Sequence, residues 1–153
     1  MSGLRPVLFL DFDGVLHPEG RDAEPFCRVE MLWQILRAYP AVDVVFSTSW
    51  RELHSFDELL NFATCNGGED LAERFVGVTP VLPYRIERVH HRESECREWL
   101  WQNQQAERPW LALDDIGRWF AGPNLYLVGP ETGLTAEDVS AVVERLQDGS
   151  RKG

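Results

Sequence analysis

Short, largely apolar runs alternate along the chain with longer segments that carry one apolar helical face. The runs lie at residues 7–10, 42–46, 110–113 and 124–128. Apolarity without a polar residue at every second position is typical of strands buried on both faces of a parallel sheet. We therefore predict strands at these four runs. A further strand is predicted within residues 76–82.

Segments with helical spacing connect these runs. One apolar face stops before Pro40, whose ring disfavours a helical residue before it, and its members are Val29, Leu32, Trp33 and Leu36. A second helix is predicted around Cys96 and Trp99. Thr135 is predicted to cap a last helix, because its hydroxyl can accept from free N–H groups of the first turn. The apolar face of that helix has the same spacing: Val139, Val142, Val143 and Leu146.

The pattern between residues 47 and 90 is harder to interpret. Residues 49–52, Ser-Trp-Arg-Glu, fit a capping box, which predicts a helix starting at Ser49 with Leu53, Phe56 and Leu60 facing inward. A short helix is predicted over residues 69–75. The further strand predicted within residues 76–82 follows this short helix.

Strands that alternate with helices indicate an α/β layer fold with a mainly parallel sheet. The length of 153 residues fits a single domain over residues 1–153. Hydrophobic residues make up 44% and charged residues 26%, which excludes a disordered or collagen-like chain. Three cysteines without CxxC spacing argue against a disulfide framework or a zinc ribbon. With apolar runs too short for a bilayer and no signal-peptide pattern, a soluble, cytoplasmic protein is expected.

The chain is acidic, with 25 Asp and Glu residues against 15 Lys and Arg residues and a formal net charge of -10. This charge repels polyanions, so general binding to nucleic acid or to an acidic membrane surface is disfavoured. Any phosphate site must therefore be local. The chain has one lysine, Lys152, next to the C-terminus. That position excludes lysine from a catalytic role in the body of the domain.

Polar side chains directly follow three of the predicted strands. Asp11 and Asp13 follow the first, Ser47 follows the second, and Asp114 and Asp115 follow the run at 110–113. Parallel strands end at one edge of a sheet, where ligands of open α/β sheets bind, so these side chains are expected to converge. Converging carboxylates raise one another's pKa unless a cation lies between them. Oxygen ligands that leave room for water and phosphate suit Mg²⁺.

Three segments in the same order resemble motifs of the haloacid dehalogenase-like (HAD) superfamily. Residues 8–16 resemble its first motif, hhhDxDGxh; residues 44–47 resemble the second, an apolar strand ending in Ser or Thr; and residues 111–115 resemble the fourth, hhhDD. The chain also resembles the small HAD domains associated with Swiss Army Knife RNA repair proteins, at residues 13–18, 47–51 and 133–135. The resemblance implies a three-layer Rossmann-like (HAD-like) fold with a minimal cap domain or none.

The resemblance also implies roles for the carboxylates. Asp11 is expected to be the nucleophile that forms an aspartyl-phosphate. Asp13 is expected to protonate the leaving oxygen and then to deprotonate the attacking water. Mg²⁺ is expected to be held by the Asp11 carboxylate, the Asp13 main-chain carbonyl and Asp114, with Asp115 assisting directly or through water.

The phosphoryl group is expected to meet residues that follow the second strand. Ser47 is expected to donate a hydrogen bond to a phosphoryl oxygen. Thr48 and Ser49 are alternatives for this contact, although Ser49 is better explained as a helix N-cap. Arg51 is another candidate phosphate contact.

The third motif of the superfamily is a lysine, and the chain departs from it. Arg92 is the best substitute, because it opens the helix that precedes the fourth motif. Arginine keeps the positive charge and adds a bidentate fork for phosphate. Residues 84–92 also hold Arg85 and Arg88, which form a local basic patch or a solvated loop.

These assignments imply a Mg²⁺-dependent phosphatase that acts on a phosphomonoester. With little chain available for a cap, the site is open to a phosphorylated small molecule or a nucleic-acid end, and the sequence favours neither. Two alternatives stay open. The missing lysine favours a regulatory or binding module with weak turnover or none. A dehalogenase is less favoured, because the second acid and the Asp pair suit phosphoryl transfer with a metal.

Overall fold

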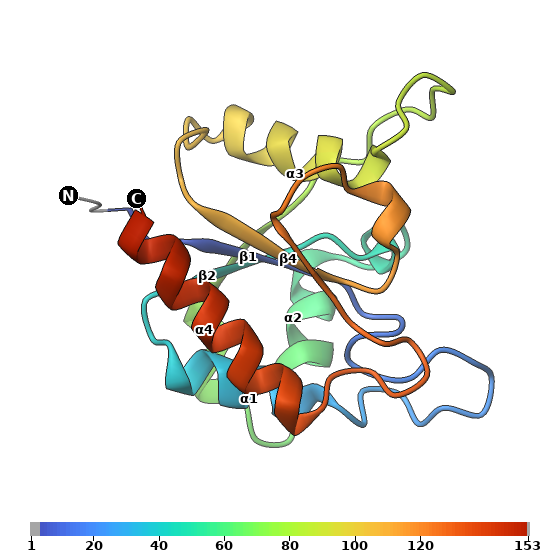
Figure 1. Cartoon of the computed structure of the whole chain (residues 1–153). Helices are drawn as coiled ribbons and strands as arrows, with labels where there is room; N and C mark the ends of the chain where they lie inside the picture. Colours follow the sequence, from blue (N-terminus) through green and yellow to red (C-terminus); the bar gives the residue numbers. More distant parts are fainter. Residues whose placement is uncertain (1–3, 153) are drawn as a thin grey trace.

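The computed structural model describes residues 4–152 and contains a five-stranded sheet in which neighbouring strands are parallel (Figure 1). The strands are β1 (Val7–Leu10), β2 (Asp43–Phe46), β3 (Phe75–Val78), β4 (Trp110–Asp114) and β5 (Leu125–Leu127). Their order is β3-β2-β1-β4-β5, so β1 is central and the direction of strand addition reverses next to it. The predicted α/β fold with a parallel sheet is confirmed.

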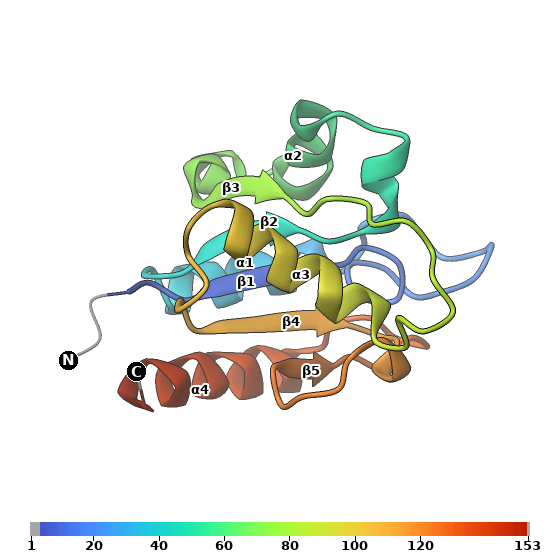
Figure 2. The same cartoon turned by 90° about the horizontal axis from the view of Figure 1, so that it is seen from above.

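Helices cover both faces of this sheet and complete three layers (Figure 1), and Figure 2 shows α3 in front of the strands. α1 (Val29–Ala38) and α4 (Ala136–Lys152) pack together on one face, and α2 (Phe56–Thr64) joins the same core near β3. α3 (His91–Gln102) covers the other face. The helices predicted from apolar spacing before Pro40, around Cys96 and after Thr135 are all confirmed.

Each central strand contributes to two cores, because successive side chains of a strand point to opposite faces. Leu8 and Leu10 of β1 lie in the core under α1, α2 and α4, whereas Val7 and Phe9 lie in the core under α3. All four side chains are fully buried, which accounts for the continuous apolar run. In the described residues, the insertions after β1 and β2 form no separate cap domain.

The helix predicted from Ser49 is wrong in its start and in the inward position of Leu53, whereas Phe56 and Leu60 pack against the core as predicted. Residues Ser49–Glu52 form a single 3₁₀ turn, whose N-cap is Thr48, with its hydroxyl accepting from the Trp50 N–H at 3.2 Å. The helix α2 begins at Phe56, where Ser55 and Glu58 make both hydrogen bonds of a capping box. Leu53 is 85% exposed. The second Ser-x-x-Glu signal in the segment defines the helix, because both of its bonds form there.

The short helix predicted over residues 69–75 is a 3₁₀ helix, Glu69–Arg74, and β3 follows it directly. Thr135 caps α4 as predicted: its hydroxyl accepts from the Asp138 N–H, and the Asp138 carboxylate accepts from the Thr135 N–H at 2.8 Å. No helix within residues 4–152 is long and apolar enough to cross a membrane.

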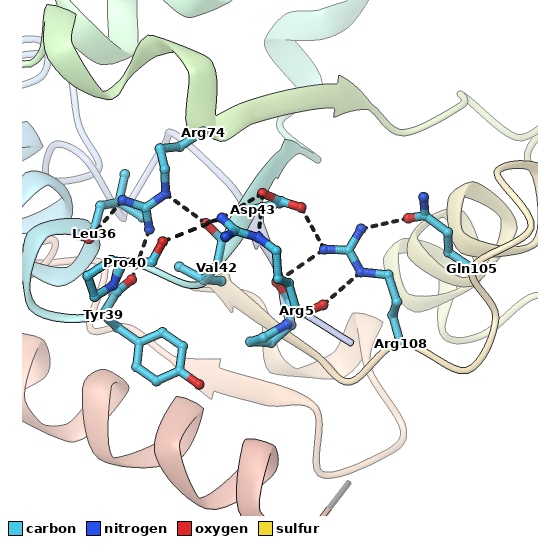
Figure 3. A network of polar contacts seen from close by, with 10 residues as sticks. Arg5, Leu36, Tyr39, Pro40, Val42, Asp43, Arg74, Gln105 and Arg108 are labelled. Carbon is cyan, nitrogen blue, oxygen red and sulfur yellow. Dashed lines mark hydrogen bonds and ion pairs between the residues drawn. The ribbon is translucent and has the colours of Figure 1, made fainter. Parts of the chain in front are cut away.

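Charged side chains join the amino ends of the strands (Figure 3). Asp43, the first residue of β2, accepts from Arg5 at 3.0 Å and from Arg108 at 2.8 Å. Arg74 donates to the carbonyls of three residues around the end of α1, namely Leu36, Tyr39 and Val42. These contacts tie together segments that lead into β1, β2 and β4, and so fix the end of the sheet that faces away from the predicted site.

Candidate functional site

Three carboxylates converge at the carboxyl end of the sheet. Asp11 follows β1 and Asp114 ends β4; these strands are adjacent, with Leu10 paired to Leu113, and the Asp11 N–H donates to the Leu113 carbonyl at 3.2 Å. One oxygen each of Asp11, Asp114 and Asp115 lies within 4.8 Å of the others. The strand register thus brings together the carboxylates that the sequence placed at two strand ends.

Burial and mutual repulsion disfavour the charged forms of these carboxylates. The pKa of Asp11 is raised well above its ordinary value by burial and then by the negative charges of Asp114 and Asp115. Burial raises the pKa of Asp114 to about 6, although the Ile116 N–H and the charge of Arg92 act in the opposite direction. Such a cluster is electrostatically unfavourable until a cation compensates it.

The donor set fits a divalent cation. Asp114 uses Oδ1 to accept from the Ile116 N–H at 2.9 Å, while its Oδ2 is buried and has no hydrogen-bond partner. A buried carboxylate oxygen without a hydrogen-bond partner lowers the stability of the fold, unless a ligand from outside the protein binds it. Asp11 and Asp115 offer further carboxylate oxygens of the kind that Mg²⁺ binds.

Gly14 allows Asp115 to approach this cluster. Gly14 has a φ of +76°, in the left-handed region that favours glycine, and a Cβ built there would lie 2.4 Å from Asp115 Oδ2. The glycine of the first motif is therefore required twice, for its backbone conformation and for space. A side chain at position 14 would displace a member of the carboxylate cluster.

Segment 129–135 supports the turn that follows Asp13. The Leu134 N–H donates to the Val15 carbonyl at 2.8 Å, and the Glu19 N–H donates to the Pro130 carbonyl at 2.8 Å. Gly133, with φ +70°, leaves room for Val15, since a Cβ on Gly133 would lie 2.9 Å from the Val15 carbonyl oxygen. The Gly-Leu-Thr sequence at 133–135 thus has a structural role close to the site.

Ser47 lies at the same carboxyl end of the sheet, one residue beyond β2. Its N–H donates to the Leu10 carbonyl at 2.9 Å, and its hydroxyl is buried without a hydrogen-bond partner. That hydroxyl is free to donate to an incoming oxygen. The Thr48 hydroxyl is buried as well, but it already accepts the capping bond from Trp50. Ser49 is exposed and does not form the predicted N-cap.

Arg92 lies close to the carboxylates, on the first turn of α3. Its Nη1 donates to the Ser47 carbonyl at 2.6 Å and to Glu95 at 3.1 Å, and its guanidinium stacks over the Trp119 ring at 5.0 Å. Its positive charge lowers the pKa of both Asp11 and Asp114. The Arg92 Nε is buried without a partner. This is a cation with donor capacity left, at the position where the sequence predicted a lysine substitute.

Arg51, in contrast, has no donor left for a phosphate. Its Nε donates to Thr79, its Nη1 to Ser47 and Thr48, and its Nη2 to Pro80, all through main-chain carbonyls at 2.9–3.2 Å. The Nη2 also pairs with Glu95 at 2.7 Å, and both side chains are at most 2% exposed. Since a guanidinium has five N–H donors, all of them are used. The predicted phosphate contact by Arg51 has no support in this arrangement, and a structural role accounts for the residue.

Asp13 lies outside the carboxylate cluster. Its side chain is 55% exposed; Oδ1 is 2.9 Å from His17 Nε2, and Oδ2 accepts from Trp50 Nε1 at 3.1 Å. A hollow of about 380 Å³ opens beside it, lined by Asp13, His17, Trp50 and residues of the segment 18–25. The predicted metal contact of Asp13 is through its main-chain carbonyl and stays a prediction.

Two further side chains near the site, Glu95 and His17, have no role among the sequence predictions. Glu95 is 1% exposed and joins Arg51, Arg92 and the Leu82 N–H, the last at 3.0 Å. The available signal was the i, i+3 spacing of Arg92 and Glu95 on one helix.

Cys96 is buried, which raises the pKa of its thiol well above the ordinary value, so it is no nucleophile.

The basic patch predicted around residues 84–92 divides in two. Arg92 lies at the site, whereas Arg85 lies in an exposed loop with Tyr84 and Ile86, each 82% exposed. The loop extends away from the body of the molecule between β3 and α3 (Figure 1). Arg88 donates to the Pro83 carbonyl within the same loop.

Comparison with known proteins agrees with this geometry. A family model described as the HAD domain in Swiss Army Knife RNA repair proteins matches residues 7–139. That range runs from β1 into α4 and includes all of the site residues described above. Neither a curated protein nor a solved structure matches the chain.

Proposed function

We propose a phosphatase activity for this chain, which belongs to the family of HAD domains in Swiss Army Knife RNA repair proteins. Membership makes it a HAD-superfamily hydrolase, and domains of this kind typically use a divalent metal. The proposed reaction is hydrolysis of a phosphomonoester through an aspartyl-phosphate on Asp11. One observation carries this proposal: the carboxylates of Asp11, Asp114 and Asp115 cluster at the carboxyl ends of β1 and β4, and the partnerless buried hydroxyl of Ser47 follows β2, the other neighbour of β1.

The cation proposed for the cluster is Mg²⁺, held by Asp11, Asp114 and Asp115 together with the main-chain carbonyl of Asp13. When bound, it would neutralise the cluster and draw phosphoryl oxygens toward Asp11. The three carboxylates and the partnerless Asp114 Oδ2 are consistent with that role. Arg92 adds a positive charge from the side of α3. In the superfamily, a lysine usually supplies this charge.

In the first step, a carboxylate oxygen of Asp11 attacks phosphorus in line. The Asp11 O–P bond forms as the ester P–O bond breaks, and the leaving oxygen takes a proton from the Asp13 carboxyl group. The Ser47 hydroxyl donates to a phosphoryl oxygen. The hollow beside Asp13 would give the departing alcohol space next to this acid.

In the second step, water attacks the aspartyl-phosphate. Asp13, now a carboxylate, takes a proton from this water as its oxygen bonds to phosphorus. The Asp11 O–P bond breaks, which releases inorganic phosphate and restores both carboxyl groups. Atoms and charge balance over the two steps, because the proton that leaves Asp13 in the first is returned in the second.

The proposed substrate is a terminal phosphate ester. No cap domain covers the described site, so a small phosphate ester and a phosphorylated nucleic-acid end both fit it, and the family's association with RNA repair favours the second. The net charge of -10 disfavours tight binding along a polynucleotide, which is compatible with recognition of an end only.

The test is phosphate release from p-nitrophenyl phosphate, measured with Mg²⁺ and with EDTA, for the wild-type chain and for Asp11→Asn. We expect Mg²⁺-dependent release that the variant loses. Nucleotides and 5′- or 3′-phosphorylated oligonucleotides would then be compared as substrates. If none of these esters releases phosphate, the proposal fails, and a regulatory module becomes the better explanation.

A further inference from the structure

The Asp13 side chain is held by two donors from separate parts of the chain. Trp50 Nε1, on the 3₁₀ turn after β2, is 3.1 Å from Oδ2, and His17 Nε2, four residues after Asp13, is 2.9 Å from Oδ1. Each carboxylate oxygen thus has its own partner. Although the carboxylate is 55% exposed, its orientation is fixed, and further acceptor positions stay open toward solvent.

The tautomer of His17 follows from a third contact. The Phe26 N–H lies 3.1 Å from His17 Nδ1, and a main-chain N–H can only donate. Nδ1 must therefore accept, which leaves the proton of the neutral ring on Nε2, facing Asp13. Phe26 has a φ of 58°, an uncommon conformation for a residue with a side chain, and this conformation aims its N–H at the imidazole.

Aromatic packing stabilises this conformation. The Phe26 ring contacts those of Phe12, His17, Trp50 and Phe62, with centroids 5.1–5.4 Å apart. His17 is 7% exposed and, together with Asp13, forms an isolated backbone bridge across the turn. A partly buried aromatic cluster thus fixes a histidine and a tryptophan, and both donate outward to one solvent-facing carboxylate.

We propose that His17 and Trp50 are positioning residues that hold Asp13 at the rim of the hollow, where it exchanges a proton with the leaving oxygen. The inference rests on the proposed function, because it assigns a purpose to the acid of that reaction. A free aspartate samples several rotamers, so holding it in one raises the fraction of molecules ready for proton transfer. In a purely structural role, the same contacts would only close the turn between residues 13 and 17.

Leaving-group chemistry separates the two roles. p-Nitrophenolate departs without a proton, whereas an alkoxide needs one, so only alkyl esters depend strongly on the acid. The ratio kcat/KM reports the step in which the leaving group departs. We would measure it for p-nitrophenyl phosphate and for glycerol 2-phosphate in the wild type and in His17→Ala, His17→Gln and Trp50→Phe.

For His17→Ala, we expect kcat/KM to fall about 10- to 100-fold for glycerol 2-phosphate and less than about 3-fold for p-nitrophenyl phosphate. The loss is smaller than most of the ~10²- to 10⁴-fold that a general acid contributes, because Asp13 itself remains. His17→Gln keeps an N–H donor and should recover most of the loss. Trp50→Phe keeps an aromatic ring but removes the N–H donor, so it should also lower kcat/KM for the alkyl ester. The matched control is His54→Ala, since His54 packs on Trp50 and Phe62 but has no hydrogen bond to Asp13.

Equal losses for the two esters in His17→Ala and Trp50→Phe, with no recovery in His17→Gln, would overturn the inference. Nitrogen NMR of the unliganded protein tests the geometry without turnover: His17 should be protonated at Nε2, and Asp13→Ala should shift the Trp50 indole signal. A proton on Nδ1, or an indole signal that does not move, overturns the inference even in an active enzyme. If the wild type releases no phosphate from any ester, the proposed function itself fails, together with the catalytic purpose assigned to these residues.

Discussion

At the amino ends of the strands, Asp43 accepts from two arginines, whereas at the carboxyl ends Asp11, Asp114 and Asp115 face one another. Both regions bring charged groups from separate segments to one edge of the same sheet. The larger hollow, about 870 Å³, lies at the amino end, yet three of its charged lining residues, Arg5, Asp43 and Arg108, are already paired with one another. Chemistry is expected where polar groups stay unpaired.

The difference between the two ends is one of free energy. A paired charge stabilises the fold modestly, whereas a buried polar atom without a hydrogen-bond partner costs free energy that a ligand can recover. Asp114 Oδ2, the Ser47 hydroxyl and the Arg92 Nε are three such groups, and all belong to the carboxyl end.

Asp11→Asn tests the comparison most directly. Replacing a covalent nucleophile should lower kcat by roughly 10⁴-fold or more. The fold should survive, because the variant removes one member of a group of mutually repelling carboxylates. Phosphate release and thermal unfolding, measured without divalent cations, check both parts. Activity near that of the wild type would exclude Asp11 as the nucleophile.

Arg92→Ala should have the next largest effect, lowering kcat by about 10²- to 10³-fold, as expected for loss of an electrostatic contact to the reacting group. Arg85→Ala and Arg88→Ala are matched controls, because they remove the same charge from the loop outside the site. If either control has the larger effect, Arg92 does not replace the lysine. Arg92→Lys should keep part of the activity, since it retains the charge but not the fork.

The pH dependence of stability should reveal the carboxylate cluster. The native pKa of Asp114 is about 6, above its ordinary value of 3.8, so the folded chain binds this proton more tightly than the unfolded chain. The protonated Asp114 carboxyl group therefore stabilises the folded state below about pH 4, and this contribution is lost as the pH rises through 6. Without divalent cations, this loss should amount to about 3 kcal/mol.

Urea unfolding of the wild type and of Asp114→Asn, between pH 4.5 and 7.5 with EDTA, isolates this contribution. The wild type should lose more stability than the variant over that range, and Mg²⁺ should restore the stability of the wild type at pH 7.5. An identical pH dependence in the two proteins, with no response to Mg²⁺, would argue against a cation site in the cluster.

Arg108→Ala at the opposite end should produce the smallest effect. It removes contacts to Asp43, Gln105 and the main-chain carbonyl of Arg5, which should lower the free energy of unfolding by about 1–2 kcal/mol. Turnover per folded molecule should stay within about twofold of the wild type, because the site lies at the other edge. Arg37→Ala, which breaks the exposed pair with Asp70, is the control and should change stability by less than about 0.5 kcal/mol.

The parts of the site that lie on strands could be predicted from the sequence. A continuous apolar run shows where a buried strand ends, and parallel pairing then places Asp11, Ser47 and Asp114 at one edge. Arg92 could be placed at the start of the helix that precedes the strand at 110–113, because it comes just before the helical spacing of Cys96 and Trp99. The mistake at Ser49 arose between two Ser-x-x-Glu signals six residues apart, which sequence alone ranks poorly.

The side-chain partners could not be predicted in the same way. The carbonyls that saturate Arg51 belong to segments around residues 47 and 79, and these segments meet only when β2 and β3 pair. The tautomer of His17 depends on a positive φ at Phe26, and a phenylalanine gives no local signal for that conformation. Contacts that depend on tertiary packing or on an uncommon backbone angle have no simple sequence period.

The contacts of Glu95 have a consequence for how this domain can be altered. Glu95 accepts from the Leu82 N–H, and the helix that carries Glu95 begins at His91, so both ends of the loop 83–90 are anchored to the same helix. Residues added at the tip would leave the anchors in place, and doubling the length of a flexible loop costs only about 0.6 kcal/mol of closure entropy. The loop therefore offers a permissive insertion point, at which a substrate-selective lid can be grafted without rebuilding the chemistry underneath.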